Sequence, residues 1–247
     1  AHYSLSALAA TLAGCRPLVV SLMGSDIRLG FLIKTAIKIC SLLIWDDLIV
    51  KSQDMVDNIG INKCKIIPNG VNITLFKPID KKTAIERLGW DERKKHILFA
   101  ADPTRPVKNF QLFKNAYDLL YAKEDIEIHV LKNIPHQDIS NHMNASDVVV
   151  LTSLWEGSPN VVKEAMSCNR PIVATDVGDI AWLFGDEPAH FLTSFDHEDV
   201  SNKLSMALAF AEKIGQTNGR MRMMDLGMDS ENIAEKLLKI YKSIPYK

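Results

Sequence analysis

The sequence lacks several features that would assign it to a chemical class. Its 247 residues include only four cysteines, which lie far apart and form no CxxC pair: Cys15, Cys40, Cys64 and Cys168. This spacing indicates neither a cysteine zinc site nor a disulfide framework, and it fits a reducing, cytoplasmic location. Lys and Arg number 29 against 30 Asp and Glu, so the net charge is −1. Such a balance argues against nucleic acid as a partner.

Long hydrophobic runs are also missing, since none reaches the ~18 residues that a membrane-spanning helix needs. The nearest candidate, residues 29–45 (LGFLIKTAIKICSLLIW), is interrupted by Lys34 and Lys38, four positions apart on one helical face. We favour a helix packed on a sheet, and the alternative is a basic amphipathic helix at a membrane surface. The alternative implies peripheral contact at the inner face of the membrane.

What the sequence does contain is 47% hydrophobic residues, arranged as short apolar strands that alternate with helical segments. Strands are expected at residues 16–22, 46–52, 64–68, 96–101, 126–131, 147–153 and 170–175. Helices are expected at 112–120, 198–214 and 231–243. The strand DVVVLTS is continuously apolar, as expected when both faces of a sheet are covered. Alternation of this kind predicts an α/β fold with parallel sheets.

The alternation restarts after the turn-rich stretch PNGVN and Pro78. We therefore expect a partial N-terminal Rossmann-like domain at residues 1–77 and a complete doubly wound domain at 78–230. A C-terminal helix at 231–247 could pack back towards the first domain. The chain starts AHYSLSALAA, without methionine, so we expect it to be a fragment of a longer protein. Ligands of doubly wound sheets bind on loops at the carboxyl ends of the strands.

The loop after the strand at 96–101 carries Arg105 and Lys108, three positions apart at the entrance to a helix. A helix N-terminus has unpaired N–H groups and a partial positive charge, so it attracts anions. An arginine fork beside a lysine adds a clamp suited to a diphosphate. When this stretch is taken alone, an ordinary basic loop is the favoured interpretation.

The second loop, EGSPNVVKEAM, begins at Glu156 directly after the strand at 147–153. Ser158 is expected to cap a helix whose first residue is Pro159. The N–H groups of Asn160 and its neighbours would then point into the same crevice. Gly157 permits close approach of the backbone to a ligand. The third loop, residues 175–179, also contains a glycine, and a plain turn is an equal interpretation there.

Two acids of the second loop suggest a sugar-and-phosphate ligand. Glu164 lies about 130° from the centre of the apolar helix face formed by Val161, Val162, Ala165 and Met166. It is therefore expected off the core, where its two oxygens can accept hydrogen bonds from the hydroxyls of a ribose. Glu156 would lie nearer the group beyond the phosphates. From the residues alone, two solvated glutamates remain an alternative of equal weight.

Taken together, three stretches resemble the family 4 retaining glycosyltransferases of GT-B fold. They are KIIPNGVN, the Arg105 and Lys108 loop, and ASDVVVLTSLWEGSPNVVKEAMSCNRPIVATDVGD. The resemblance runs from about residue 16 to the end, and its most specific element is E-x7-E from Glu156 to Glu164. It implies a GT-B-type fold with two Rossmann-like doubly wound parallel-sheet domains, the first incomplete in this chain. A nucleotide-sugar donor, UDP- or GDP-linked, would bind between them.

The resemblance also implies roles for the candidate residues. Arg105 and Lys108 would bind the donor diphosphate and stabilise the leaving phosphate. Glu156 would contact the donor sugar near the reacting centre, and Glu164 would hold the ribose. The remaining donor-binding positions would be Gly24, Gly157, Ser158, Pro159 and Asn160. No metal or cofactor is implied, because fixed cations and helix dipoles would neutralise the diphosphate.

The sequence departs from the family pattern in three places. Met23 stands where a histidine usually precedes the Gly-x-Asp element, here Gly24 to Asp26, so a polar contact to the donor sugar is lost or moved. The glycine-rich strand and loop that begin the family's first domain are absent, which leaves the acceptor side incomplete. Asn169 replaces a frequent glycine, and asparagine tolerates the left-handed conformation, so no loss is expected there.

The sequence therefore predicts a metal-independent retaining glycosyltransferase of hexosyl type, acting in polysaccharide or glycolipid synthesis. Its partners would be a nucleotide sugar and a glycan or lipid-linked acceptor. One alternative is a sugar-nucleotide-binding module without turnover, since a fragment of such an enzyme could be inactive. Another is a GT-B relative such as an epimerase or a phosphorylase.

Overall fold

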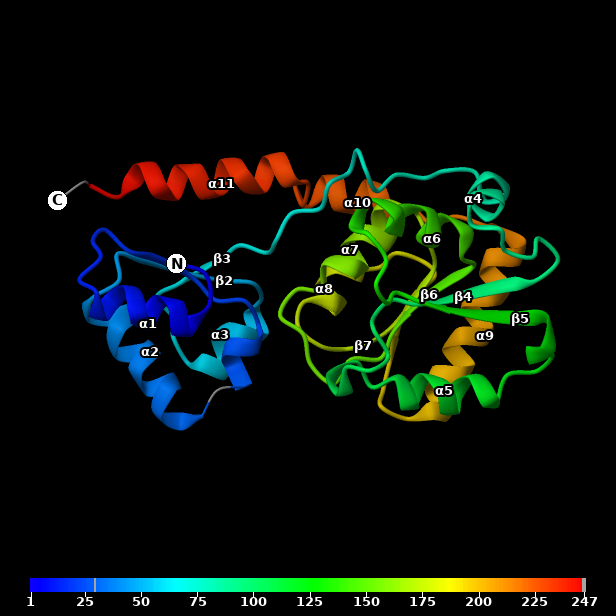
Figure 1. Cartoon of the computed structure of the whole chain (residues 1–247), viewed down its shortest axis with the longest axis horizontal. Helices are drawn as coiled ribbons and strands as arrows, with labels where there is room; N and C mark the ends of the chain where they lie inside the picture. Colours follow the sequence, from blue (N-terminus) through cyan, green and yellow to red (C-terminus); the bar gives the residue numbers. More distant parts are fainter. Residues whose placement is uncertain (29, 246–247) are drawn as a thin grey trace. The chain divides into compact units, whose positions relative to one another are not determined.

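The structure, a computed structural model, describes residues 1–28 and 30–245. The first residue of the predicted segment 29–45 and the last two of 231–247 therefore lie outside the described residues. The chain is an α/β protein whose strands form two parallel sheets, as predicted (Figure 1). Its internal contacts divide it into two units. The first unit contains residues 1–70, 156–158 and the helix that begins at Ser230, and the second contains residues 71–155 and 159–229.

The first unit is built on a parallel sheet of three strands in the order β1-β2-β3. Each predicted strand of this region contains one of them: β1 (Val19–Ser21), β2 (Asp47–Val50) and β3 (Lys65–Ile66). The helices are α1 (Ser4–Leu12), the 3-10 turn η1 (Ser25–Arg28), α2 (Phe31–Leu43), α3 (Gln53–Ile59) and α11 (Ser230–Ser243). Apolar side chains of β1, β2, α1, α2 and α3 share one core, which includes Val20, Leu48 and Ile37.

Helix α2 confirms the predicted helix within residues 29–45. Its buried residues are Ile37, Cys40 and Ser41, so one narrow stripe packs onto the unit. Five apolar residues of the same helix are exposed: Phe31, Leu32, Ile39, Leu42 and Leu43. None of the helices in the described part of the chain has the length and apolar character needed to cross a bilayer.

The second unit is a doubly wound domain with a five-stranded parallel sheet in the order β5-β4-β6-β7-β8. The strands are β4 (Lys95–Phe99), β5 (Ile126–Val130), β6 (Val148–Leu151), β7 (Ile172–Thr175) and β8 (His190–Thr193). Numbered within the unit, this order is 2-1-3-4-5, and the direction of winding reverses between β4 and β6. Ligands of such sheets bind at this switch point, beyond the carboxyl ends of the strands.

Helices cover both faces of this sheet (Figure 1). Helices α5 (Phe110–Asp118) and α9 (His197–Lys213) pack together on one face. The other elements are α4 (Lys81–Leu88), α6 (Ile139–Ala145), α7 (Asn160–Ser167), α8 (Ile180–Phe184), α10 (Gly219–Asp225), and the 3-10 turns η2 (Pro106–Lys108), η3 (Lys123–Asp125) and η4 (His136–Asp138). Every residue of β6 is buried, in agreement with its continuous apolar run.

Asn169 was expected to tolerate the left-handed backbone conformation. Asn169 has φ 55, so it does adopt the left-handed conformation, and its side-chain oxygen accepts a hydrogen bond from the Arg220 backbone N–H at 2.8 Å.

Helix α6 was not predicted from the sequence pattern. This helix buries Ser140 and Asn144, and Asn144 bonds to the backbone of Lys77 and Ile79. Polar residues therefore occupy positions where an apolar repeat would have revealed the helix.

Candidate functional site

The candidate site begins with two loops that flank the switch point of the second unit. One follows β4 and the other follows β6, and a direct backbone bond joins them, from Leu154 N–H to Val107 O at 2.8 Å. The hydroxyl of Thr152, at the end of β6, also donates to Asn109 O at 3.0 Å. These bonds hold the loops together at the carboxyl edge, where ligands of this fold bind.

The loop after β7 joins the same edge. The buried hydroxyl of Thr175 donates to Ser153 O at 2.7 Å, which connects the end of β7 to the loop after β6. Gly178 follows with φ 66, a conformation that favours glycine, and α8 starts two residues later. The three loops selected from the sequence thus lie along one edge, as parallel strands require.

The two cations of the first loop differ in burial. A short 3-10 turn, η2, connects them, and Lys108 N–H donates to Arg105 O at 2.9 Å. Arg105 is exposed, whereas Lys108 is only 9% exposed. Asn109 then adopts φ 50 and turns the chain into α5. The arrangement presents an open guanidinium and a partly enclosed ammonium before a helix entrance, which suits an anion of two phosphates.

Helix α7 begins one residue later than the sequence indicated. The predicted cap was Ser158 with Pro159 as the first helical residue, but Pro159 is itself the cap, with φ −70 and ψ 116. Its extended ψ prevents it from joining the helix, so Asn160 becomes the first helical residue. Asn160 is exposed, and its backbone N–H is one of those that a helix N-terminus leaves for a ligand.

Glu164 was predicted to lie off the core at the helix flank, and this was wrong because the residue is buried. The residue is only 7% exposed, because neighbouring elements cover α7 on several sides and residues 162–167 are all buried. Its carboxylate oxygen lies 3.1 Å from Nε2 of His136. Burial raises the pKa of the Glu164 carboxyl, and the hydrogen bond and charge of His136 act in the opposite direction.

His136 is a further candidate site residue, which the sequence did not indicate. It starts η4 in the loop after β5, and its side chain is 65% exposed. The ring also contacts Phe76 edge to face, with centroids 5.3 Å apart. The rule that ligands bind at the carboxyl ends of parallel strands applies to β5 as well, so searching that loop would have found it.

Four remaining candidates, Gly24, Glu156, Gly157 and Ser158, group with the first unit. Gly24 has φ 97, and a Cβ added to Gly157 would lie 2.9 Å from the Gly24 Cα. Gly157 therefore permits a close approach, but to the backbone of Gly24. Asp26 is fully buried, and its carboxylate accepts hydrogen bonds from the backbone N–H groups of Ser4 and Met23. Arg105, Lys108, Pro159, Asn160 and Glu164 belong to the second unit.

Comparison with known sequences adds evidence independent of this geometry. Residues 117–209 match the family model described as Glycosyl transferases group 1. TuaC of Bacillus subtilis, a candidate teichuronic acid biosynthesis glycosyltransferase, is 22% identical, with 74% of this chain and 56% of that protein aligned. The UDP-Gal:alpha-D-GlcNAc-diphosphoundecaprenol alpha-1,3-galactosyltransferase of Escherichia coli is 27% identical, with 56% of this chain and 43% of that protein aligned. The chain spans about half the length of the curated relatives it matches.

Solved structures show the same fold at low sequence identity. Sucrose-phosphate synthase from Thermosynechococcus elongatus has a TM-score of 0.82 and 18% identity, over 98% of this chain and 72% of that one. Anabaena HepE, solved in complex with UDP-glucose, has a TM-score of 0.77 and 18% identity, over 97% and 75%. The predicted fold class is confirmed: the chain has the fold of the GT-B glycosyltransferases, and its sequence relatives support a glycosyltransferase of group 1.

Proposed function

We propose that the protein is a family 4 retaining glycosyltransferase that moves a hexose from a nucleotide sugar to a glycan or lipid-linked acceptor in polysaccharide or glycolipid synthesis. The observation that carries this proposal is the carboxyl edge of the second unit. There the loop of Arg105 and Lys108 is bonded to the loop that leads into α7, the helix of Glu164. Two cations, a helix N-terminus and a carboxylate are the groups that a nucleoside diphosphate requires.

In the proposed donor site, different residues bind the diphosphate and the ribose of the ligand. Arg105 and Lys108 bind the diphosphate, with the N–H groups at the start of α7 beside them. Glu164 accepts hydrogen bonds from the ribose hydroxyls, with His136 at its carboxylate. The remaining proposed contacts are those of Glu156 with the donor sugar and of Gly24, Gly157 and Ser158 with the donor. Fixed positive groups compensate the diphosphate charge, so the proposed reaction is metal-independent.

The proposed transfer retains the anomeric configuration by a front-face route. The bond between the sugar C1 and the diphosphate oxygen breaks, and the acceptor oxygen bonds to C1 on the same face. The leaving phosphate takes the acceptor proton, so no protein base has to gain it. Lys108 and Arg105 stabilise the negative charge that grows on the leaving oxygen, which is where fixed cations lower a barrier most.

UDP-linked hexoses are the first donors to test, and GDP-linked hexoses are the second. HepE was solved with UDP and with UDP-glucose, and the Escherichia coli relative is named for a UDP-galactose donor. The name of the latter also specifies a diphosphoundecaprenol acceptor, which supports a lipid-linked acceptor here.

A sugar-nucleotide-binding module without turnover is the second candidate. The observation that favours it is that Arg105, Lys108 and Glu164, the candidate residues for the nucleotide, all lie in the second unit. Radiolabelled UDP-glucose incubated with the chain and a mixture of glycan and lipid-linked acceptors separates the two. A transferase delivers label to an acceptor with the anomeric configuration unchanged. Donor binding without transfer or hydrolysis supports the module. Release of a sugar phosphate from a glycan, in a second incubation with inorganic phosphate, supports a phosphorylase.

Peripheral membrane contact through α2 is part of the proposal. The helix exposes Phe31, Leu32, Leu42 and Leu43 and carries Lys34 and Lys38, a composition that binds anionic membrane surfaces. The chain should therefore cosediment with vesicles of anionic lipid, and replacing Leu32 and Leu43 by serine should weaken this. Equal recovery of the variant and the original chain with the vesicles would count against contact through α2.

A further inference from the structure

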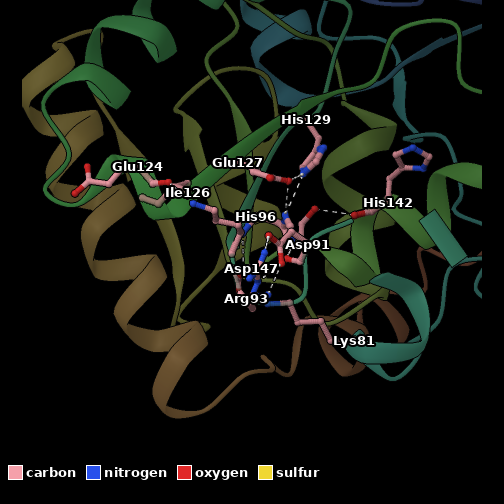
Figure 2. A network of polar contacts seen from close by, with 12 residues as sticks. Lys81, Asp91, Arg93, His96, Glu124, Ile126, Glu127, His129, His142 and Asp147 are labelled. Carbon is pink, nitrogen blue, oxygen red and sulfur yellow. Dashed lines mark hydrogen bonds and ion pairs between the residues drawn. The ribbon is translucent and has the colours of Figure 1, made fainter. Parts of the chain in front are cut away.

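A second cluster of ligand-type side chains lies in the second unit, away from the proposed donor site. His96 stands near the amino end of β4, and Glu127 and His129 lie on the edge strand β5. The strands are parallel neighbours, with His96 opposite Glu127 and Leu98 opposite His129. Because side chains alternate along a strand, all three lie on the same face of the sheet. Figure 2 shows the three side chains directed towards one another.

The distances within this cluster match the size of a metal site. His96 Nδ1 lies 3.0 Å from His129 Nε2, and each of these nitrogens lies 3.8 Å from Glu127 Oε2. A triangle with these sides has a circumradius of about 2.1 Å, so one point is about 2.1 Å from all three atoms. Zinc binds histidine nitrogen at roughly 2.0–2.1 Å and carboxylate oxygen at roughly 2.0–2.2 Å. That point lies in the plane of the three atoms, and tetrahedral coordination requires the ion out of this plane, so small movements of the partly exposed His129 and Glu127 side chains complete the site.

Neighbouring residues orient the imidazoles of His96 and His129 for metal binding. His96 Nε2 lies 3.1 Å from the carbonyl oxygen of Asp91, to which it donates in the neutral form. The Nδ1 lone pair of His96 is then directed at the cluster, and a backbone carbonyl partner of this kind is what metal-binding histidines usually have. Trp90 stacks on His129, with ring centroids 3.4 Å apart and planes 3° apart, which restricts that ring.

We propose that His96, Glu127 and His129 bind one divalent transition-metal ion of the zinc class, with water as the fourth ligand. Two imidazoles and one carboxylate favour Zn²⁺ over Mg²⁺ or Ca²⁺, which prefer oxygen ligands. His96 is fully buried, but the side chains of His129 and Glu127 are 18% and 41% exposed, so an ion can enter from solvent. The ion joins the edge strand β5 to β4. Its role is structural, because the reacting groups of the proposed transfer lie at the other end of the strands.

The experiment is calorimetric titration of the chain with ZnCl₂ after EDTA treatment and its removal. We expect one Zn²⁺ per chain, a higher melting temperature with the metal, and visible absorption when Co²⁺ replaces it. Glu127→Gln and His129→Gln should each weaken binding at least ~10-fold. Both residues are partly exposed, so these variants are expected to fold. His197→Gln, at an exposed histidine on α9, should bind Zn²⁺ as the original chain does.

Two outcomes would overturn the metal site. One is the absence of saturable Zn²⁺ binding by the original chain, in which case the histidines form only a hydrogen-bonded pair. The other is Zn²⁺ binding that Glu127→Gln and His129→Gln leave unchanged, which would place the ion on other residues. Circular dichroism of each variant without metal shows whether it is folded. A folded Glu127→Gln chain whose melting temperature Zn²⁺ raises as much as that of the original chain would also contradict the site.

Discussion

Replacing Lys108 by alanine should lower kcat for sugar transfer by about 10²–10³-fold, the usual effect of removing one fixed group that stabilises charge in a transition state. The reason is the position of Lys108, which lies in the loop at the switch point and is only 9% exposed. Low exposure to water strengthens its attraction to the charge on the leaving phosphate. The melting temperature should change much less than the rate. Initial rates of transfer and thermal unfolding of both proteins are the measurements.

Lys114→Ala is the matched control for this experiment. Lys114 lies on α5, the helix that follows the same loop, and pairs with Asp118 at 3.1 Å on the exposed surface. Such a pair contributes little to stability, so this variant should keep its full rate. An unchanged rate in Lys108→Ala, or an equal loss of rate in Lys114→Ala, would show that Lys108 does not stabilise the leaving group.

Replacing Glu164 by glutamine should weaken the binding of a nucleoside diphosphate by about 10- to 100-fold. A hydrogen bond to a charged group contributes roughly 1.5–3 kcal/mol, and 1.4 kcal/mol corresponds to tenfold in affinity. Glutamine preserves the size of the side chain and an oxygen that can accept from His136. Calorimetric titration with UDP measures the change. Glu212→Gln, at an acid that pairs with Lys95 on the surface, should leave the affinity unchanged.

The same substitution should not lower stability at neutral pH. Burial raises the pKa of Glu164, so the folded chain binds this proton more tightly than the unfolded chain does. The contribution of Glu164 to stability is then greatest below its unfolded pKa and is lost as pH rises through its folded pKa. At pH 7 glutamine removes the cost of a buried charge, and the variant should melt at the same or a higher temperature. Unchanged affinity for UDP would refute the ribose role of Glu164.

The sequence could predict at which edge of the sheet the candidate site lies, because this depends on local patterns of apolar residues. Continuous apolar runs identified β4, β6 and β7, and parallel strands bring their following loops to one edge whatever the details of packing. The positions of Arg105 and Lys108 therefore followed from the pattern. The left-handed conformation of Asn169 followed from its residue type in the same way.

Other parts of the site depend on contacts between distant segments. A helical projection places Glu164 relative to its own helix, but its burial depends on the elements that cover α7, and its partner His136 comes from the loop after β5. The His96, Glu127 and His129 cluster needs the register of β4 against β5, which no local pattern specifies. Strand β8 and helix α6 were also missed. Elements that are short, or whose buried residues are polar, show no clear hydrophobic period.

Calorimetric titration of the chain with UDP and with GDP tests whether the carboxyl edge of the second unit binds a nucleotide sugar. We expect that one nucleotide binds per chain, that Glu164→Gln and Lys108→Ala each weaken its binding, and that Lys114→Ala and Glu212→Gln do not. Absence of binding of both nucleotides would contradict this site. Binding with the same affinity to the original chain and to both site variants would contradict it as well.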